Sequence, residues 1–374
     1  MKKNILTFLA LAAILSLLLV SCAKVEEAAP AEEAAPVEEE AAPAEEEAAP
    51  AEEEAAEEKT LIAYMPQNTG NPYFERILVG FEKACEELGT CEILYTAPAT
   101  TGATDQIPFI EEAVQKGIDV LCIQSNSQDA LNTVLDDVRA KGILVFTNNS
   151  DITDNESHRD ASVLNVNLAE TGDDLLEEIA AVMDYKGKFA IVSATVDAPA
   201  QLVWMESIND LLENDPKYAE MELLEVAYGD DLPEKTLTET EALLVKYPDI
   251  EGILAITAVA GPIVGQVLEQ QGIYPGGPNA KDGGVFGVGT CLPSMCKDYV
   301  MNGVMPNVLL WDPADAGYAS VYLAMGVLDE TIKIEPDACF DIPGKPQECF
   351  DEKLLIYAAD PFVFTPENIE QFNF

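Results

Sequence analysis

Short apolar runs alternate with longer amphipathic segments along most of the chain after residue 60. Four runs in the first half carry no polar alternation, which is typical of strands buried on both faces of a parallel sheet. These runs are residues 61–65, 93–96, 120–124 and 144–147. Between them, apolar positions recur with helical spacing at residues 73–88, 105–116 and 129–141. Each helical segment closes at a glycine, which favours a helix end, so the pattern predicts a doubly wound α/β unit.

The same rhythm restarts after Asn167 and continues to residue 289. Strands are predicted at residues 189–193, 223–227, 252–256 and 285–289, each preceded by a helical segment. The fold class is therefore predicted as α/β, with two doubly wound parallel-sheet units in tandem. Ligands of such sheets bind beyond the carboxyl ends of the strands. The residues that follow each strand are thus the candidates for a binding site.

The first residues follow the pattern of an export signal. Lys2 and Lys3 precede an apolar run, residues 5–20, and the run ends in Leu-Val-Ser before Cys22. This ending resembles a bacterial lipobox, which implies that residues 1–22 are a lipoprotein signal peptide and that Cys22 is lipidated. Two acyl chains would anchor the protein stably to the outer face of the cell membrane. The alternative is an ordinary secretory signal in which Cys22 is incidental.

Residues 23–58 consist almost entirely of Ala, Glu and Pro, with a period of seven residues. A heptad usually predicts a coiled coil, but this one lacks an apolar seam and places Pro43 and Pro50 inside each repeat. Like charges and proline favour an extended chain. We therefore expect a disordered spacer between the lipid and a folded part, residues 59–374, that is long enough for two domains.

The folded part is strongly acidic. Taking the three lysines of residues 1–24 and the fifteen glutamates of residues 23–58 from the total of −48 leaves a net charge of −36. Nucleic acid and anionic lipid are bound by basic surfaces, so neither is expected as a partner. Membrane contact is expected only through the N-terminal lipid, and the acidic residues are interpreted as a solvated surface.

Seven cysteines follow Cys22, and six of them lie in close pairs along the sequence. The pairs are Cys85 with Cys91, Cys291 with Cys296 and Cys339 with Cys349. In an exported protein such pairs favour disulfides over metal sites, and the single histidine of the chain weakens the metal interpretation further. Cys122 stands inside an apolar run and is interpreted as a buried core thiol.

The segment after the first predicted strand carries a family resemblance. Its residues Asn71, Pro72, Tyr73 and Phe74 resemble the Asn-Pro-aromatic-aromatic turn of the ribose-type (class I) sugar-binding proteins that serve ABC importers. Further segments look like the rhamnose-binding and autoinducer 2-binding branch of that family. They are residues 187–195, 228–231, 310–313, 317–318 and 359–364. The resemblance covers residues 60–374 in order.

The resemblance implies two lobes of a periplasmic binding protein-like fold, joined by three hinge crossings near Val166, Leu310 and Ala338. The N-terminal lobe would contain residues 59–166 and 311–338, and the C-terminal lobe residues 167–310 and 339–374. It also implies a monomer without a cofactor that binds a rhamnose-like 6-deoxyhexose, a pentose or a related polyol. The lobes would close over this sugar and deliver it to the subunits of an ABC permease. Two alternatives remain open: an autoinducer 2-binding protein, and a sugar-sensing module that presents its ligand to a membrane receptor.

A sugar requires aromatic faces for its C–H patches and amide or carboxylate groups for its hydroxyls. In the first lobe Tyr73 and Phe74 are the aromatic candidates and Asn71 is a polar one. The alternatives are that one or both of these aromatic residues are core residues at a helix start and that Asn71 only shapes the turn. Asn149 stands where relatives commonly carry an Asp. Asp151 either compensates for that loss or is a solvated loop residue.

Other site positions depart from the pattern of the family. Gln67 replaces a lysine of the autoinducer 2 binders, and Ala200 replaces the polar partner of Gln201 in the second lobe. Ile256 stands where relatives have Pro, and Thr257 beside it is a further candidate for ligand contact. Together with Asn149, the departures at Gln67, Ala200 and Ile256 make autoinducer 2 the less favoured ligand, since such changes alter specificity.

The segment near the second crossing supplies the last candidates. Trp311 is expected to cover the ligand while Asp312 accepts a hydroxyl, with the alternative that Trp311 only seals the hinge core. Trp204, on a helix of the second lobe, is interpreted as a packing residue.

Catalysis is not expected. The chain has 68 acidic residues, so paired carboxylates are inevitable by number, and nothing singles out one pair for glycoside hydrolysis. The single histidine, His158, lies in a polar loop. The sequence contains no Gly-x-Ser-x-Gly elbow, Walker loop or zinc-ligand spacing, which leaves no metal site in the prediction.

Overall fold

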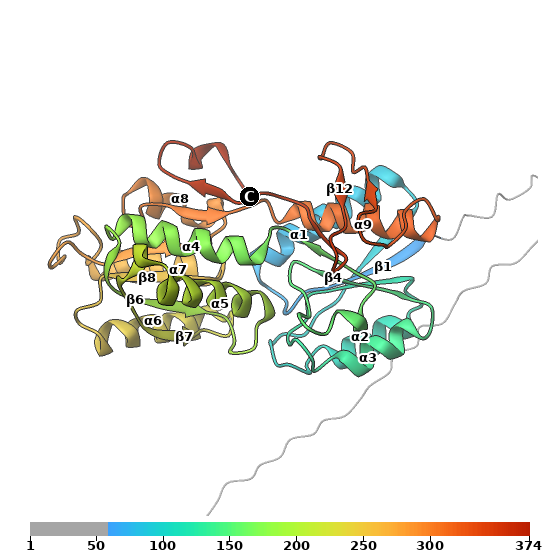
Figure 1. The fold of residues 1–374 in the computed structure, drawn as a ribbon, viewed down its shortest axis with the longest axis horizontal. Helices are drawn as coiled ribbons and strands as arrows, with labels where there is room; N and C mark the ends of the chain where they lie inside the picture. Colours follow the sequence, from blue (N-terminus) through green and yellow to red (C-terminus); the bar gives the residue numbers. More distant parts are fainter. Residues whose placement is uncertain (1–58) are drawn as a thin grey trace, which may run out of the picture. The chain divides into compact units, whose positions relative to one another are not determined.

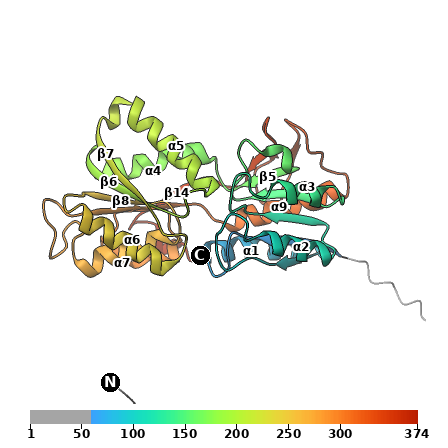
Figure 2. The same ribbon diagram turned by 90° about the horizontal axis from the view of Figure 1, so that it is seen from below.

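The computed structural model describes residues 59–374, which build two lobes, each around its own sheet (Figures 1 and 2). The predictions for the signal peptide, for lipidation of Cys22 and for the spacer lie outside these described residues. None of the helices between residues 59 and 374 has the length and apolarity that a membrane crossing demands.

The first lobe is built on a six-stranded sheet in the order β13-β5-β4-β3-β1-β2, with every neighbouring pair parallel. Its strands are β1 (Thr60–Met65), β2 (Cys91–Tyr95), β3 (Val120–Ile123), β4 (Leu144–Asn148), β5 (Ala161–Leu164) and β13 (Leu355–Tyr357). Helices α1 (Pro72–Leu88) and α9 (Ala314–Leu328) cover one face, and α2 (Ile107–Gln115) and α3 (Asn132–Arg139) cover the other. Side chains alternate along a strand, so Ile62 and Tyr64 pack in the first layer while Ala63 and Met65 pack in the second.

The second lobe repeats this design around a parallel sheet in the order β7-β6-β8-β9. Its strands are β6 (Lys186–Ser193), β7 (Glu220–Tyr228), β8 (Gly252–Ala255) and β9 (Phe286–Gly289). One face carries α4 (Leu168–Val182) and α5 (Pro199–Asn214), and the other carries α6 (Pro233–Lys246) and α7 (Ala260–Gln271). Helix α8 (Pro293–Met301) and an antiparallel pair, β10 (Val308–Leu310) with β14 (Phe362–Phe364), complete the lobe. The predicted α/β class with two parallel-sheet units is thus confirmed.

The chain passes between the lobes three times, at residues 165–167, 311–313 and 358–361. The expected third crossing near Ala338 is wrong, because the chain stays in the first lobe after α9. There it forms a hairpin of β11 (Cys339–Phe340) and β12 (Glu348–Cys349), and β13 then pairs with β5. Residues 339–357 therefore belong to the first lobe.

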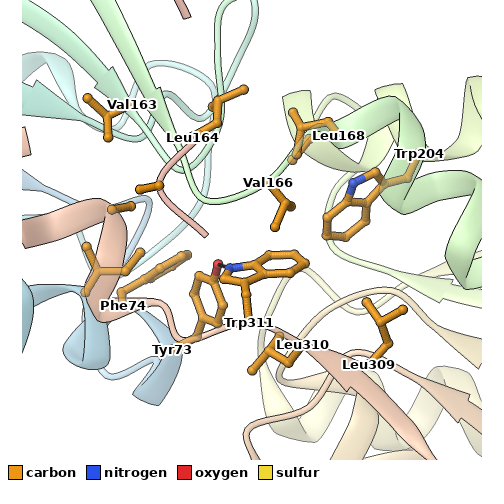
Figure 3. Close-up of a cluster of buried hydrophobic side chains, with 14 of the residues drawn as sticks. Tyr73, Phe74, Val163, Leu164, Val166, Leu168, Trp204, Leu309, Leu310 and Trp311 are labelled. Atoms are coloured by element: carbon orange, nitrogen blue, oxygen red, sulfur yellow. Dashed lines mark hydrogen bonds between the residues drawn. The ribbon is translucent and has the colours of Figure 1, made fainter. Parts of the chain in front are cut away.

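An apolar cluster runs through the crossings and joins the cores of the two lobes (Figure 3). Val166 in the first crossing is 1% exposed and Trp311 in the second is 3% exposed. Leu164 and Leu310 flank these residues and are also buried. Because Val166 and Trp311 are buried, the positions of the first two crossings are set by the cores of both lobes.

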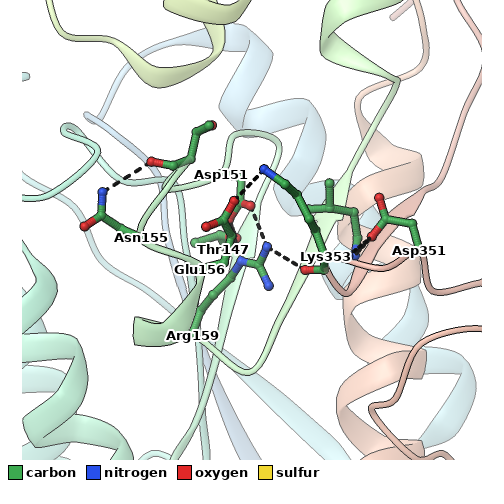
Figure 4. A network of polar contacts seen from close by, with 9 residues as sticks. Thr147, Asp151, Asn155, Glu156, Arg159, Asp351 and Lys353 are labelled. Atoms are coloured by element: carbon green, nitrogen blue, oxygen red, sulfur yellow. Dashed lines mark hydrogen bonds and ion pairs between the residues drawn. The ribbon is translucent and has the colours of Figure 1, made fainter.

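The segment before β13 is tied to the first lobe by a buried ion pair (Figure 4). Arg159 Nε and Nη2 donate to the two carboxylate oxygens of Asp151 at 2.6 Å each, and Arg159 Nη2 also donates to the Lys353 carbonyl at 3.0 Å. Thr147 Oγ1 donates to Asp151 Oδ1 at 2.6 Å. Both interpretations of Asp151, as a ligand carboxylate and as a solvated loop residue, are therefore wrong.

The six paired cysteines form three disulfides within the described residues: Cys85–Cys91, Cys291–Cys296 and Cys339–Cys349. Two of them close short connections beside a helix, and the third closes the hairpin of β11 and β12. Cys122 on β3 is a buried free thiol, and burial raises its pKa.

We predict that Asp151→Ala lowers the free energy of unfolding by about 3 kcal/mol, because Arg159 would remain buried without its partner. Lys353→Ala removes only an exposed pair, 2.9 Å from Glu156, and should change that free energy by less than about 0.5 kcal/mol. Urea-induced unfolding followed by circular dichroism measures both. Equal losses in the two variants would contradict the role assigned to the buried pair.

Candidate ligand-binding site

A cavity lies between the two lobes, at the carboxyl ends of strands from both sheets. The empty volume between the atoms of the cavity, including its opening to solvent, is about 520 Å³. From the first lobe and the second crossing it is lined by Gln67, Asn71, Tyr73, Phe74, Asn149, Ser150 and Trp311. From the second lobe it is lined by Ala200, Gln201, Trp204, Asp231, Thr257, Ala258, Thr290 and Leu310.

Four buried aromatic side chains form one wall of the cavity (Figure 3). Trp311 Nε1 donates to the Tyr73 hydroxyl at 2.8 Å, and these two rings meet edge to face, with centroids 6.4 Å apart. On its other side Trp311 meets Trp204 edge to face, with centroids 6.3 Å apart. Phe74 packs against Tyr73 in the same manner. Edge-to-face contacts hold the rings in place in this arrangement of the lobes. Trp204, expected only to pack, also lines the cavity.

The hydroxyl of Tyr73 belongs to a hydrogen-bonded network with two asparagines. It donates to Asn149 Oδ1 at 2.5 Å, and Asn165 Nδ2 donates to Asn149 Oδ1 at 3.0 Å and to the Tyr73 hydroxyl at 3.3 Å. Burial raises the pKa of Tyr73, so its hydroxyl keeps its proton. Because Asn149 Oδ1 is already occupied by two donors, its amide nitrogen is the group left for a ligand.

The other predicted amides are partly committed to the protein. Asn71 Oδ1 accepts from the Tyr73 backbone N–H at 3.0 Å and caps α1, so Asn71 shapes the turn as well as lining the cavity. Gln67 Nε2 donates to the Ser125 carbonyl at 3.1 Å, and Gln201 Nε2 donates to the Ile256 carbonyl at 3.3 Å. These bonds orient both glutamines and leave their Oε1 atoms as acceptors.

Asp312 does not join the cavity. Its carboxylate receives two hydrogen bonds from Arg76 of α1, at 2.8 and 2.6 Å, and one from the Ala314 N–H at 3.0 Å, which caps α9. It faces a second hollow, on the other side of the crossing, where Arg76 also lies against the ring of Phe374. The prediction that Asp312 accepts a ligand hydroxyl is therefore corrected: it fixes α1 and α9 to the crossing.

Four polar atoms of the lining residues are buried and have no hydrogen-bond partner in the described part of the chain. They are Ser150 Oγ, Trp204 Nε1, Asp231 Oδ1 and Thr290 Oγ1. A buried polar group without a partner destabilises a protein by about 1–3 kcal/mol, so such groups are normally paired. A ligand that brings several donors and acceptors at once would pair them.

None of these four residues was predicted as a contact, although one signal was available. Ser150, Asp231 and Thr290 each follow the carboxyl end of a strand, where ligands of such sheets bind. Trp204 lies three residues beyond Gln201 on α5, and residues at this spacing share a helix face.

Asp231 is the one carboxyl group among the residues that line the cavity. It is 7% exposed, and burial raises its pKa to about 6. The Thr257 hydroxyl opposes this shift, and the charge of Asp230 adds to it. Within residues 59–374 no cluster of His, Cys, Asp and Glu is arranged to hold a metal ion.

We predict that Asp231→Asn stabilises the empty protein at pH 7.5 but not at pH 4. The pKa is raised in the folded state, so ionisation of Asp231 destabilises the fold progressively from about pH 4 and fully above about pH 6. Relative to the unmodified protein, the expected gain at pH 7.5 is about 2 kcal/mol. Thermal melts at the two pH values measure it. The control is Asp230→Asn, at the half-buried neighbour that is paired with Lys235. A gain of equal size at both pH values in Asp231→Asn would contradict the assignment.

Comparisons with known proteins agree with this architecture. A family model described as "Periplasmic binding protein domain" matches residues 62–331. An ABC transporter solute-binding protein from Clostridium phytofermentas, solved with bound L-rhamnose, is 27% identical with a TM-score of 0.77, over 84% of this chain and 98% of that one. LsrB from Clostridium saccharobutylicum, in complex with AI-2, is 20% identical with a TM-score of 0.75, over 84% of this chain and 100% of that one, and shares the fold.

One curated relative matches part of the chain. The Xylose/arabinose-binding protein XylF of Sulfolobus acidocaldarius is 23% identical over 248 residues, which are 64% of this chain. The match spans 59% of the length of that relative.

Proposed function

Because the chain belongs to the periplasmic binding protein family, we propose that it binds one small uncharged sugar between its lobes and delivers it to an ABC permease. The observation that carries the proposal is the cavity between the lobes, where aromatic faces and four unpartnered polar atoms come together. A sugar offers both C–H faces and hydroxyl groups to such a lining. The similar structure with bound L-rhamnose supports this class of ligand.

The lining favours a neutral ligand. No Lys, Arg or His is among the residues that line the cavity, so nothing there would balance a phosphate or carboxylate of the ligand. A rhamnose-like 6-deoxyhexose, a pentose or a related polyol meets these requirements. Each buried hydroxyl bond contributes about 1 kcal/mol net and aromatic contacts a similar amount, which together give micromolar affinity or better.

Capture proceeds by closure of the lobes. Both lobes contribute to the lining, so a sugar makes its full set of contacts only when they are together and thereby stabilises the closed arrangement. Trp311 in the second crossing contacts Tyr73 of the first lobe and Trp204 of the second. The aromatic wall is therefore completed by closure, and the permease would recognise the closed form.

The sequence supports a location of the protein outside the cytoplasm. A lipid on Cys22 would tether the monomer to the membrane, and the acidic residues 23–58 would hold the lobes away from the lipid surface. A sensory module of the same fold would use the same closure. Reading frames for a permease and an ATPase next to the gene distinguish import from sensing.

We expect a thermal-shift screen of L-rhamnose, D-xylose, L-arabinose and autoinducer 2 to find a sugar that raises the melting temperature. A ligand that binds only the folded protein stabilises it in proportion to its affinity and concentration. Small-angle scattering with that sugar should show a more compact molecule. No shift with any compound, one unchanged shape, or turnover of the sugar would each contradict the proposal.

We expect Ser150→Ala and Thr290→Val each to weaken binding of that sugar about fivefold, which corresponds to one lost hydrogen bond of about 1 kcal/mol. Ser162→Ala is the matched control. Its hydroxyl is also buried without a partner, but it lies on β5 and does not line the cavity. Isothermal titration calorimetry measures the three affinities. A similar loss in the control would remove Ser150 and Thr290 from the site.

A further inference from the structure

Two buried aspartates of this protein differ in how their charge is balanced. Asp151 is 5% exposed and receives two hydrogen bonds from Arg159, which is what a structural carboxylate requires. Asp231 is 7% exposed, makes no ion pair among the described residues, and its Oδ1 atom has no hydrogen-bond partner. The protein itself therefore leaves Asp231 with unused acceptor capacity inside the cavity.

Two other groups that line the cavity differ from the Asp231 carboxylate in the hydrogen bonds that they can make. Trp204 Nε1 is a donor without a partner, and Thr290 Oγ1 is a hydroxyl without one; both line the same cavity from the second lobe. An ionised carboxylate only accepts hydrogen bonds, an indole N–H only donates, and a hydroxyl does both. Together they offer a ligand with several hydroxyl groups an acceptor, a donor and a group that does both.

We propose that Asp231 is the specificity-determining residue of the cavity, and that its ionised carboxylate accepts hydrogen bonds from neighbouring hydroxyl groups of the sugar. Ligand capture then requires Asp231 to have lost its proton, so binding is linked to pH. The inference rests on the proposed function. It extends that function by assigning the acceptor and by predicting a proton released on binding.

The charged groups near Asp231 do not neutralise it. Asp230 in the same loop adds a like charge, and Lys235 of α6 pairs with Asp230 at 2.6 Å rather than with Asp231. Glu239, further along α6, lines an outer hollow with Asp230 and Lys235. From the opposing lobe Thr101 donates to the Asp230 carbonyl at 3.4 Å and brings no charge. Thr257, after β8, supplies a neutral hydroxyl.

The direction of the pH effect follows from this environment. In the empty protein the pKa of Asp231 is about 6, raised mainly by burial. Hydroxyl groups that donate to the ionised form lower this pKa in the complex, so binding releases a proton. Affinity is then constant above about pH 6.5 and falls up to about tenfold for each pH unit below 6.

The test is isothermal titration calorimetry of the full chain at pH 7.5, 6.0 and 5.0, in two buffers with different ionisation enthalpies. The probe is whichever of L-rhamnose, D-xylose and L-arabinose binds most tightly at pH 7.5. For the unmodified protein we expect a Kd about tenfold higher at pH 5.0 than at pH 7.5, and a released proton at pH 5.0. Asp231→Asn should bind more weakly at pH 7.5, with a Kd that no longer changes with pH and no proton release.

Asp230→Asn is the matched control, one residue away but not among the residues that line the cavity; it should keep most of the pH dependence. Circular dichroism of Asp231→Asn verifies that the variant is folded. Binding that is independent of pH in the unmodified protein, or a pH dependence that persists in Asp231→Asn, overturns this inference and leaves the proposed function intact. If none of the three sugars binds at any pH, the proposed function and the inference both fail.

Discussion

The hydrogen bond from Trp311 Nε1 to the Tyr73 hydroxyl is the contact on which the rest of the site depends. Tyr73 stands in the first turn of α1, just after the cap made by Asn71, and Trp311 stands where the chain crosses to the first lobe. The bond therefore sets the position of a crossing relative to the core of one lobe. Trp204 of the second lobe packs against the other side of Trp311, so Trp311 contacts both lobes. Trp311 therefore belongs both to the aromatic wall of the cavity and to the hinge between the lobes.

Polar side chains near the cavity have two kinds of role. Those that hold the fold together have hydrogen-bond partners within the protein, and those that line the cavity keep an atom without one. Asp312 and Asp151 are each bound bidentately by an arginine, so their charges are balanced by the protein and hold backbone segments together. Ser150, Trp204, Asp231 and Thr290 keep a buried atom unpaired around the cavity. Since an unpaired buried group destabilises the fold, four such atoms beside one cavity are an argument for binding there.

The periodicity of the sequence predicted the two parallel-sheet units and most of their elements, but not how the last part of the chain is placed. Strand β13 has only three residues, so it carries too few repeats to be recognised. The third crossing was misplaced for that reason, because pairing of β13 with β5 keeps residues 339–357 in the first lobe. Among the predicted site residues, those of the aromatic turn and the amides line the cavity, whereas Asp312 does not. Asp231 lines the cavity but was not predicted to do so.

By itself the sequence determined what is local: the order of strands and helices, the glycine ends of helices, the cysteine pairs and the aromatic turn. Their signals lie within a few residues of one another, because side chains repeat every two residues in a strand and every 3.6 in a helix. Only the tertiary structure decided which polar groups find partners. Arg76 and Asp312 are 236 positions apart, and Trp311 and Tyr73 are 238 apart. The chain topology brings such residues together, and the same topology leaves Asp231 Oδ1 at the cavity without a hydrogen-bond partner.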